Sequence, residues 1–90
     1  MDSNATPRKR LSVVFQELES GEKLLYDMKA RRTFRLNETG VFFWSRCDGT
    51  TSVRDITKDV ASEAEVPGEV VLRDALEFFE KLQHLGLLEL

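Results

Sequence analysis

The chain offers few residues for covalent or acid–base chemistry. It has one histidine, His84, and one cysteine, Cys47, which lie far apart in the sequence. A catalytic centre needs a nucleophile beside a base, a pair of perturbed carboxylates or a metal cluster, and no Cys/His pair has the spacing of zinc ligands. The glycines fall at expected turns and helix ends, not in a phosphate-binding loop. The sequence therefore predicts a protein that is not an enzyme, with no catalytic residue, no metal site and no cofactor.

A cluster of basic residues is the more informative polar feature. Lys29, Arg31, Arg32 and Arg35 place four positive charges within seven residues, with no acidic residue among them. Charges on an edge strand often serve only to block unwanted strand pairing. The alternative is a basic edge that accepts an acidic, extended segment of a partner, and the residues leave both interpretations open.

Length and charge limit the classes of function. Ninety residues, of which 41% are hydrophobic and 32% charged, suit one small globular domain. The net charge of −3 argues against a protein held on nucleic acid by a broad positive field. A single cysteine excludes an intrachain disulfide and suits a reducing compartment. No apolar run reaches the roughly 18 residues of a membrane-spanning helix, and the polar N-terminus lacks the apolar core of a signal peptide. We therefore expect a cytoplasmic protein that does not enter a membrane.

The domain is expected to begin after a short tail. Residues 1–10 are polar, contain Pro7 and end in Arg8-Lys9-Arg10. A short basic run of this kind is more often a solvated end than a binding segment, so we expect a flexible tail over residues 1–10 and the folded domain over residues 11–90.

Three short strands are predicted at the start of the domain. Residues 11–18, 23–28 and 32–36 are rich in β-branched, aromatic and leucine side chains, with turn signals between them. In the first strand the alternation puts Leu11, Val13 and Phe15 on one face, and in the third strand it puts Phe34 and Leu36 on the same face. Three successive strands joined by tight turns indicate an antiparallel meander, whose outer strand is open to a partner strand unless another element covers it.

Three helices are predicted after the strands. Asn37 is a good N-cap for a helix that ends at Asp48-Gly49, and Ser52 caps a second helix that stops before Pro67. A third helix covers residues 68–84, after which Leu87-Leu88 can fold back. The expected core-facing residues of the three helices are Val41, Phe43, Trp44 and Cys47, then Val53, Ile56, Val60 and Ala64, then Leu72, Ala75, Leu76, Phe79 and Leu82. The predicted fold class is α+β, a winged helix-turn-helix-like domain with a three-stranded antiparallel sheet followed by three helices.

The order of these motifs resembles the PqqD-like family. The matching features are Leu36-Asn37-Glu38-Thr39-Gly40, Trp44, Asp48-Gly49, Ser52-Val53, and a last amphipathic helix with Asp74 that closes with Gly86-Leu87-Leu88. The resemblance implies a winged helix-turn-helix variant that recognises the leader segment of a ribosomal precursor peptide and presents it to a modifying enzyme such as a radical enzyme, a cyclase or a protease. It further implies that the leader pairs with the third strand and lies between that strand and the third helix. Pyrroloquinoline quinone synthesis, lasso-peptide maturation and radical-enzyme systems share the pattern.

Candidate binding residues follow from that placement. Thr33, Phe34 and Arg35 are expected to offer backbone groups and flanking side chains to an incoming strand, and Arg32 with Arg35 to attract acidic leader residues. Residues spaced by three or four share one face of a helix. The candidates on the third helix are Val71, Asp74, Phe78 and Lys81. An open strand edge also permits a weak or strand-swapped dimer in place of a monomer.

Three other functions compete with peptide binding. A winged-helix DNA-binding regulator fits the helix order, but Glu69, Asp74, Glu77 and Glu80 on the third helix would repel phosphates. A small enzyme would need a cofactor from a partner. A domain that only mediates assembly would use the same strand edge or Phe42, which should point away from the core.

Overall fold

The predicted sheet is present in the computed structural model, which describes residues 1–89. Strands β2 (Val13–Glu17), β3 (Lys23–Asp27) and β4 (Arg32–Leu36) form an antiparallel meander in the order β2-β3-β4. Phe15, Leu25 and Phe34 lie opposite one another in the register, and Leu25 in the middle strand is fully buried. The three-stranded antiparallel sheet is therefore confirmed.

The turn before β4 is fixed by local hydrogen bonds. Asp27 Oδ1 accepts from the backbone N–H groups of Lys29 at 3.0 Å and Ala30 at 3.2 Å, which is how an aspartate stabilises a turn. Arg31 closes the connection in the left-handed region, with φ of 54°. This turn starts β4 at Arg32, the residue that the alternation predicted.

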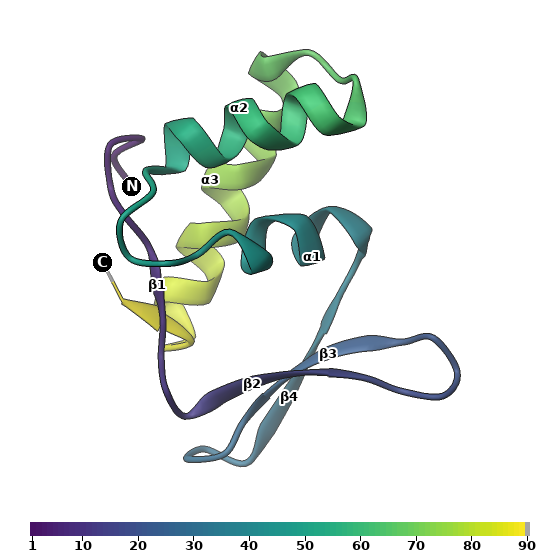
Figure 1. Cartoon of the computed structure of the whole chain (residues 1–90). Coiled ribbons are helices and arrows are strands. Elements are labelled where there is room, and N and C mark those ends of the chain that lie inside the picture. The colour runs from purple at the N-terminus through teal and green to yellow at the C-terminus, as the bar shows by residue number, and fades with distance from the viewer. Residues whose placement is uncertain (90) are drawn as a thin grey trace.

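The first strand is shorter than predicted. It begins at Val13, so Leu11 lies before the sheet and is 99% exposed. The far end of the β2–β3 hairpin extends past the helices (Figure 1). Phe15, in the middle of the edge strand β2, is 42% exposed although it lies opposite the fully buried Leu25. Val13 and Phe15 share one face of β2, as predicted, whereas the expectation that Leu11 joins them on that face is wrong because Leu11 lies outside the strand.

The first two helices begin at the predicted caps. Helix α1 (Glu38–Ser45) follows Asn37, whose side chain accepts from the Gly40 N–H at 2.8 Å. Helix α2 (Val53–Ala64) follows Ser52, whose hydroxyl accepts from the Asp55 N–H at 3.1 Å. Each cap satisfies one of the N–H groups that a helix leaves without a partner in its first turn.

The third helix and the end of the chain also form as expected. Helix α3 (Gly68–His84) has the predicted bounds. Gly86 takes a φ of 76°, a backbone conformation that glycine adopts at little cost, and the Leu87 N–H then donates back to the Leu82 carbonyl at 2.9 Å. Leu87 and Leu88 are both buried, so the chain folds back onto the last turn.

The N-terminal segment is not the detached tail that the sequence suggested. Strand β1 (Arg8–Lys9) pairs antiparallel with β5 (Leu88–Glu89), giving a second, two-stranded sheet. The Ala5 carbonyl accepts from the Val53 N–H at 2.9 Å and the Ser3 carbonyl from the Arg54 N–H at 2.8 Å. These donors start α2 and have no carbonyl partner within the helix. Residues 1–10 therefore pack against the domain because they satisfy the first turn of α2.

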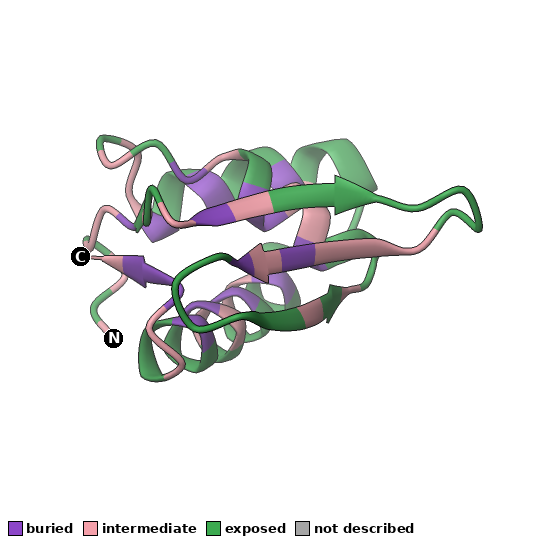
Figure 2. Cartoon of the chain, turned by 90° about the horizontal axis from the view of Figure 1, so that it is seen from below, coloured by how far each residue is buried: buried purple, intermediate pink, exposed green. Residues whose placement is uncertain are grey.

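The core lies between the helices and one face of the sheet (Figures 1 and 2). Its large buried side chains are Leu25, Phe43, Trp44, Ile56, Phe79, Leu82, Leu87 and Leu88. Near the start of α3, Val71 is buried in this core, whereas Leu72 and Leu76, which were expected there, are only half-buried. None of the helices within residues 1–89 is long and apolar enough to cross a membrane.

Cys47 belongs to the core, as expected. Its thiol donates to the Phe43 carbonyl at 3.4 Å, and burial raises the pKa of Cys47 to about 12. A thiol that stays protonated is a poor nucleophile, so Cys47 is a packing residue.

Candidate functional site

Strand β4 is an edge of the sheet. It pairs with β3 on one side, and within the described residues no strand pairs with its other side (Figure 2). An edge strand presents backbone N–H and C=O groups that can pair with another chain. Thr33 and Arg35 are exposed on the face of β4 turned away from the helices, while Phe34 and Leu36 are half-buried on the other face.

A hollow of about 420 Å³ lies between β4 and α3. It is lined from β4 by Thr33, Phe34, Arg35 and Leu36, from the α1 cap by Asn37, from α3 by Phe78, Lys81 and Leu82, and from the C-cap of α3 by Leu85. Apolar side chains from two elements thus meet beside a strand edge. Such a place can offer backbone pairing and side-chain pockets to the same ligand.

Phe78 forms part of the floor of this hollow. Its ring is half-buried and packs on Phe43 and Phe79, with centroid distances of 5.5 Å and 5.3 Å. Helix α1 comes close because it has a glycine at the contact: a Cβ on Gly40 would lie 3.1 Å from Phe78 Cε1. Phe78 is therefore held by the core on one side and open to the hollow on the other.

The basic residues of β4 already have internal partners. Arg32 donates to the Leu85 carbonyl at 3.2 Å and lies over the Phe34 ring, so it ties β4 to the end of α3. Arg35 is 79% exposed and forms an ion pair with Glu22 at 2.8 Å. Lys81 on α3 forms no ion pair within the described residues. The positive charge at this edge is thus shared between Arg35, partly neutralised, and Lys81.

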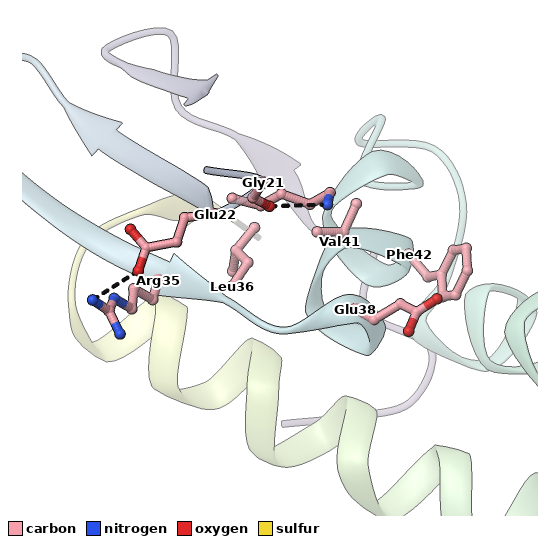
Figure 3. Close-up of a pocket in the computed structure, with 8 residues that line it drawn as sticks. Gly21, Glu22, Arg35, Leu36, Glu38, Val41 and Phe42 are labelled. Atoms are coloured by element: carbon pink, nitrogen blue, oxygen red, sulfur yellow. Dashed lines mark hydrogen bonds and ion pairs between the residues drawn. The ribbon is translucent and has the colours of Figure 1, made fainter. Parts of the chain in front are cut away.

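A separate, larger hollow of about 630 Å³ lies on the other side of the same strand end (Figure 3). It separates the β2–β3 turn, at Gly21 and Glu22, from α1, at Glu38, Val41 and Phe42. Figure 3 shows the Arg35–Glu22 ion pair at its rim. Phe42 is half-buried and lines this hollow, as expected for an aromatic residue pointing away from Phe43.

The structure brings together most of the predicted site residues. Thr33, Phe34, Arg35, Phe78 and Lys81 line the hollow beside β4. Asp74 lines an adjoining hollow that shares Asn37, Phe78 and Lys81 with the first. These two adjoining hollows form a groove beside β4. Arg32 lies at the Leu85 end of this groove, where it donates to the Leu85 carbonyl.

Val71 differs from the other candidates. It is 5% exposed and lies beside α1 and α2, away from β4, because the first turns of α3 pack on those two helices. The expectation that Val71 lines the groove beside β4 is therefore not met.

The sequence reasoning missed the other lining residues. Leu36 shares a strand face with Phe34, and Leu82 and Leu85 follow Phe78 by four and seven residues on one helix face. That spacing was the signal that could have found them. Asn37 was identified as a cap, but not as a lining residue.

The titratable residues do not converge on the groove. Within residues 1–89, no three His, Cys, Asp or Glu side chains are grouped to hold a metal ion. The pKa of Asp48 is lowered, chiefly by backbone hydrogen bonds from Thr50 and Thr51, but Asp48 lies in the connection between α1 and α2. What the groove offers a ligand is a strand edge, apolar walls and a few charges.

Comparison with known proteins identifies the family. The family described as coenzyme PQQ synthesis protein D (PqqD) matches residues 22–88, which include β3, β4 and all three helices. The chain belongs to the PqqD family. No curated protein matches the chain.

Solved structures with the same fold include three of note. Lasso peptide synthetase B1, complexed with the leader peptide, superposes with a TM-score of 0.80 at 23% identity and covers 96% of this chain and 100% of its own. TbiB1 in complex with the TbiA(β) leader peptide gives 0.77 at 24% identity, with 91% and 94% covered. The PqqD truncation of Methylobacterium extorquens PqqCD, a stand-alone recognition element, gives 0.78 at 22%, with 93% and 88% covered. At these identities the likeness establishes the fold of this PqqD-family chain.

Proposed function

We propose that this PqqD-family chain is a non-catalytic recognition module that captures the leader segment of a ribosomally made precursor peptide and presents it to a modifying enzyme. The observation that carries the proposal is the open edge of β4 beside a hollow with an apolar floor from α3. The family membership supports it. So do the two fold neighbours whose structures contain leader peptides.

The backbone of the leader pairs with residues 33–35 of β4. Main-chain hydrogen bonds to an edge strand give affinity with little dependence on sequence. Because β2, β3 and β4 are antiparallel, an added strand that continues the pattern runs from the Leu36 end of β4 toward Arg32. Thr33 and Arg35 then flank its outer face, and Phe34 its inner face.

Side-chain specificity comes from the floor and the charges of the hollow. A leucine or aromatic residue of the leader packs on Phe78 and Phe34, in a hollow of about 420 Å³. Arg35 and Lys81 favour an acidic residue nearby and act mainly on the association rate, because both are solvent-exposed. Arg32 keeps a structural role, since it bridges β4 to Leu85.

The module works in the cytoplasm, where ribosomal peptides are made, and acts as a monomer whose β4 edge is kept for the leader. A second copy paired at this edge would compete with the peptide. The DNA-binding alternative is disfavoured because Glu69, Glu77 and Glu80 lie exposed on α3, the helix that would approach phosphates.

Selection from a random peptide library tests the proposal and needs no candidate precursor. Sixteen-residue peptides displayed on their own mRNA are selected on the immobilised domain, and the most enriched peptide is titrated into isotope-labelled protein. We expect amide shift changes at residues 33–36 and 78–85. No enrichment over empty beads, or shift changes confined to the β2 edge, would overturn the proposal.

N-methylation of the selected peptide tests strand pairing itself. In a paired strand, alternate residues direct their N–H groups toward the neighbouring strand. Methylating one alternate set should abolish binding, while methylating the other should have little effect. Equal effects of both sets would mean that the peptide is bound without joining the sheet.

A further inference from the structure

The groove beside β4 continues along α3 past the end of the sheet. The hollow at β4 shares Asn37, Phe78 and Lys81 with a second hollow of about 410 Å³ at the N-terminal turn of α1. This second hollow shares Thr39 and Asp74 with a third, of about 400 Å³. One face of α3 runs past all three hollows. Its residues, spaced by three or four, are Lys81, Phe78, Asp74 and Val71.

The third hollow lies where the three helices meet. Its apolar walls are Phe42 from α1, Val60 from α2, Val66 from the following turn and Val71 from α3. Figure 1 shows α1 between α2 and the sheet, so this hollow is on the far side of α1 from β4. A peptide that reaches it has left the strand edge and must be held by its side chains.

The charge along the groove reverses between its two ends. Arg35 and Lys81 are the charged residues that line the hollow at β4. Glu38, Glu63 and Asp74 line the third hollow, with no basic residue among its lining. Glu63 pairs with Arg46, whereas Glu38 and Asp74 form no ion pair within the described residues. A ligand that spans both ends is therefore favoured when its own charges reverse in the opposite sense.

We propose that the hollow between α1, α2 and α3 is a second anchor for the same peptide, taking an apolar side chain that is next to a lysine or arginine. This inference rests on the proposed function, because the occupant is the continuation of the strand-paired leader past the Leu36 end of β4. The apolar side chain fills the space between Phe42, Val60 and Val71, and the basic neighbour faces Asp74 and Glu38. For a peptide antiparallel to β4, this anchor precedes the strand-paired segment.

The geometry of α3 sets the spacing of the two anchors. From Phe78 to Val71 the helix advances about 10 Å at ~1.5 Å per residue. An extended peptide covers that distance in about three residues at ~3.3 Å each. The selected peptides should therefore carry an apolar–basic pair about three residues before the side chain that packs on Phe78.

Filling the hollow tests the second anchor. Ala64 is an exposed residue of α2 that lines it, and Ser62 is exposed on the same helix outside its lining. Ala64→Trp should weaken binding of the selected sixteen-residue peptide about tenfold, the loss expected for one displaced apolar side chain. Ser62→Trp, the matched control, should have no effect. Thermal unfolding of both variants checks that the fold is retained.

A truncated peptide distinguishes a failure of the second anchor from a failure of the proposed strand-edge site. Removing the apolar–basic end should weaken wild-type binding about tenfold and make Ala64→Trp indistinguishable from wild type. Asp74→Asn should weaken only the peptide that keeps its basic residue. Equal binding of whole and truncated peptides by wild type, or equal losses from the two tryptophan variants, would overturn the second anchor and leave the strand-edge site intact. Failure to enrich any peptide would overturn both.

Discussion

Phe78 is the residue at which folding and binding can be separated most clearly. It packs on Phe43 and Phe79 from one side and forms the groove floor on the other. Full burial of a phenylalanine is worth about 3–5 kcal/mol against alanine. Because Phe78 is half-buried, Phe78→Ala should lower the free energy of unfolding by about 2 kcal/mol.

That loss should leave the domain folded. A 90-residue domain has a free energy of unfolding of about 5–13 kcal/mol, and a change of ~1 kcal/mol shifts Tm by about 4–8 °C at this size. Phe78→Ala should therefore lower Tm by roughly 8–16 °C, as followed by Trp44 fluorescence. Phe79→Ala removes a fully buried ring and should cost the full amount of about 3–5 kcal/mol, which lowers Tm by roughly twice as much as Phe78→Ala.

The binding effect needs a control with the same stability cost. Leu76 is also half-buried on α3, but it lies on the opposite side of the helix, in a shallow depression with Leu72 and Glu80. Leu76→Ala should lower Tm comparably and leave peptide affinity unchanged, whereas Phe78→Ala should weaken affinity about tenfold. The reasoning is refuted if Phe78→Ala unfolds the domain, or if both variants weaken binding to the same extent.

Three further changes test other parts of the structure. Arg35→Glu should weaken an acidic peptide by up to about fivefold and remove most of the salt dependence of binding, while Glu22→Gln should strengthen it by releasing Arg35; unchanged affinity at low salt would contradict this. Leu88→Ala, in the strand that pairs with β1, should cost about 2–5 kcal/mol of stability in chemical denaturation, and a cost near zero would mean that the β1–β5 pair does not pack on the core. Because burial raises the pKa of Cys47 to about 12, the thiol of the unfolded protein ionises at lower pH than the thiol of the folded protein. The stability that the protonated thiol contributes should be complete below about pH 9 and be lost as the pH rises toward 12. Cys47→Val should remove this fall of the free energy of unfolding with pH, and its absence in wild type would mean that the thiol does not stay buried.

Local signals in the sequence predicted the elements well. The Asn37 and Ser52 caps each act within three residues of their donor, so the residues that form the contact are close together in the chain. Gly86 likewise ends α3 with a conformation that depends on one residue. Strand β4 was predicted with its observed bounds because the alternation of Phe34 and Leu36 depends only on neighbouring residues.

Contacts between distant segments could not be read in the same way. The pairing of β1 with β5 joins Arg8 to Glu89, and nothing in a two-residue strand indicates its partner. On α3, the face shared by Val71, Asp74, Phe78 and Lys81 was predicted, but which neighbour covers each turn depends on how the helices cross. That is why Val71 is core and Leu82 lines the groove as well as packing inward.

The connection between β4 and α1 places the open strand edge beside α3 and so forms the groove. Asn37 follows the last residue of β4, caps α1 and lines the hollow, so one residue connects the open edge, the start of the helix and the hollow. Gly40 costs α1 up to about 1 kcal/mol of helix propensity relative to alanine. In return the helix backbone approaches Phe78, and a Cβ there would stand 3.1 Å from its ring and 3.2 Å from the cap oxygen of Asn37. A bulkier residue would push the ring into the hollow or disturb the cap. Gly40, although a weak helix former, therefore allows both the Phe78 ring at the floor of the groove and the Asn37 cap at the start of α1 to keep their positions beside the strand edge.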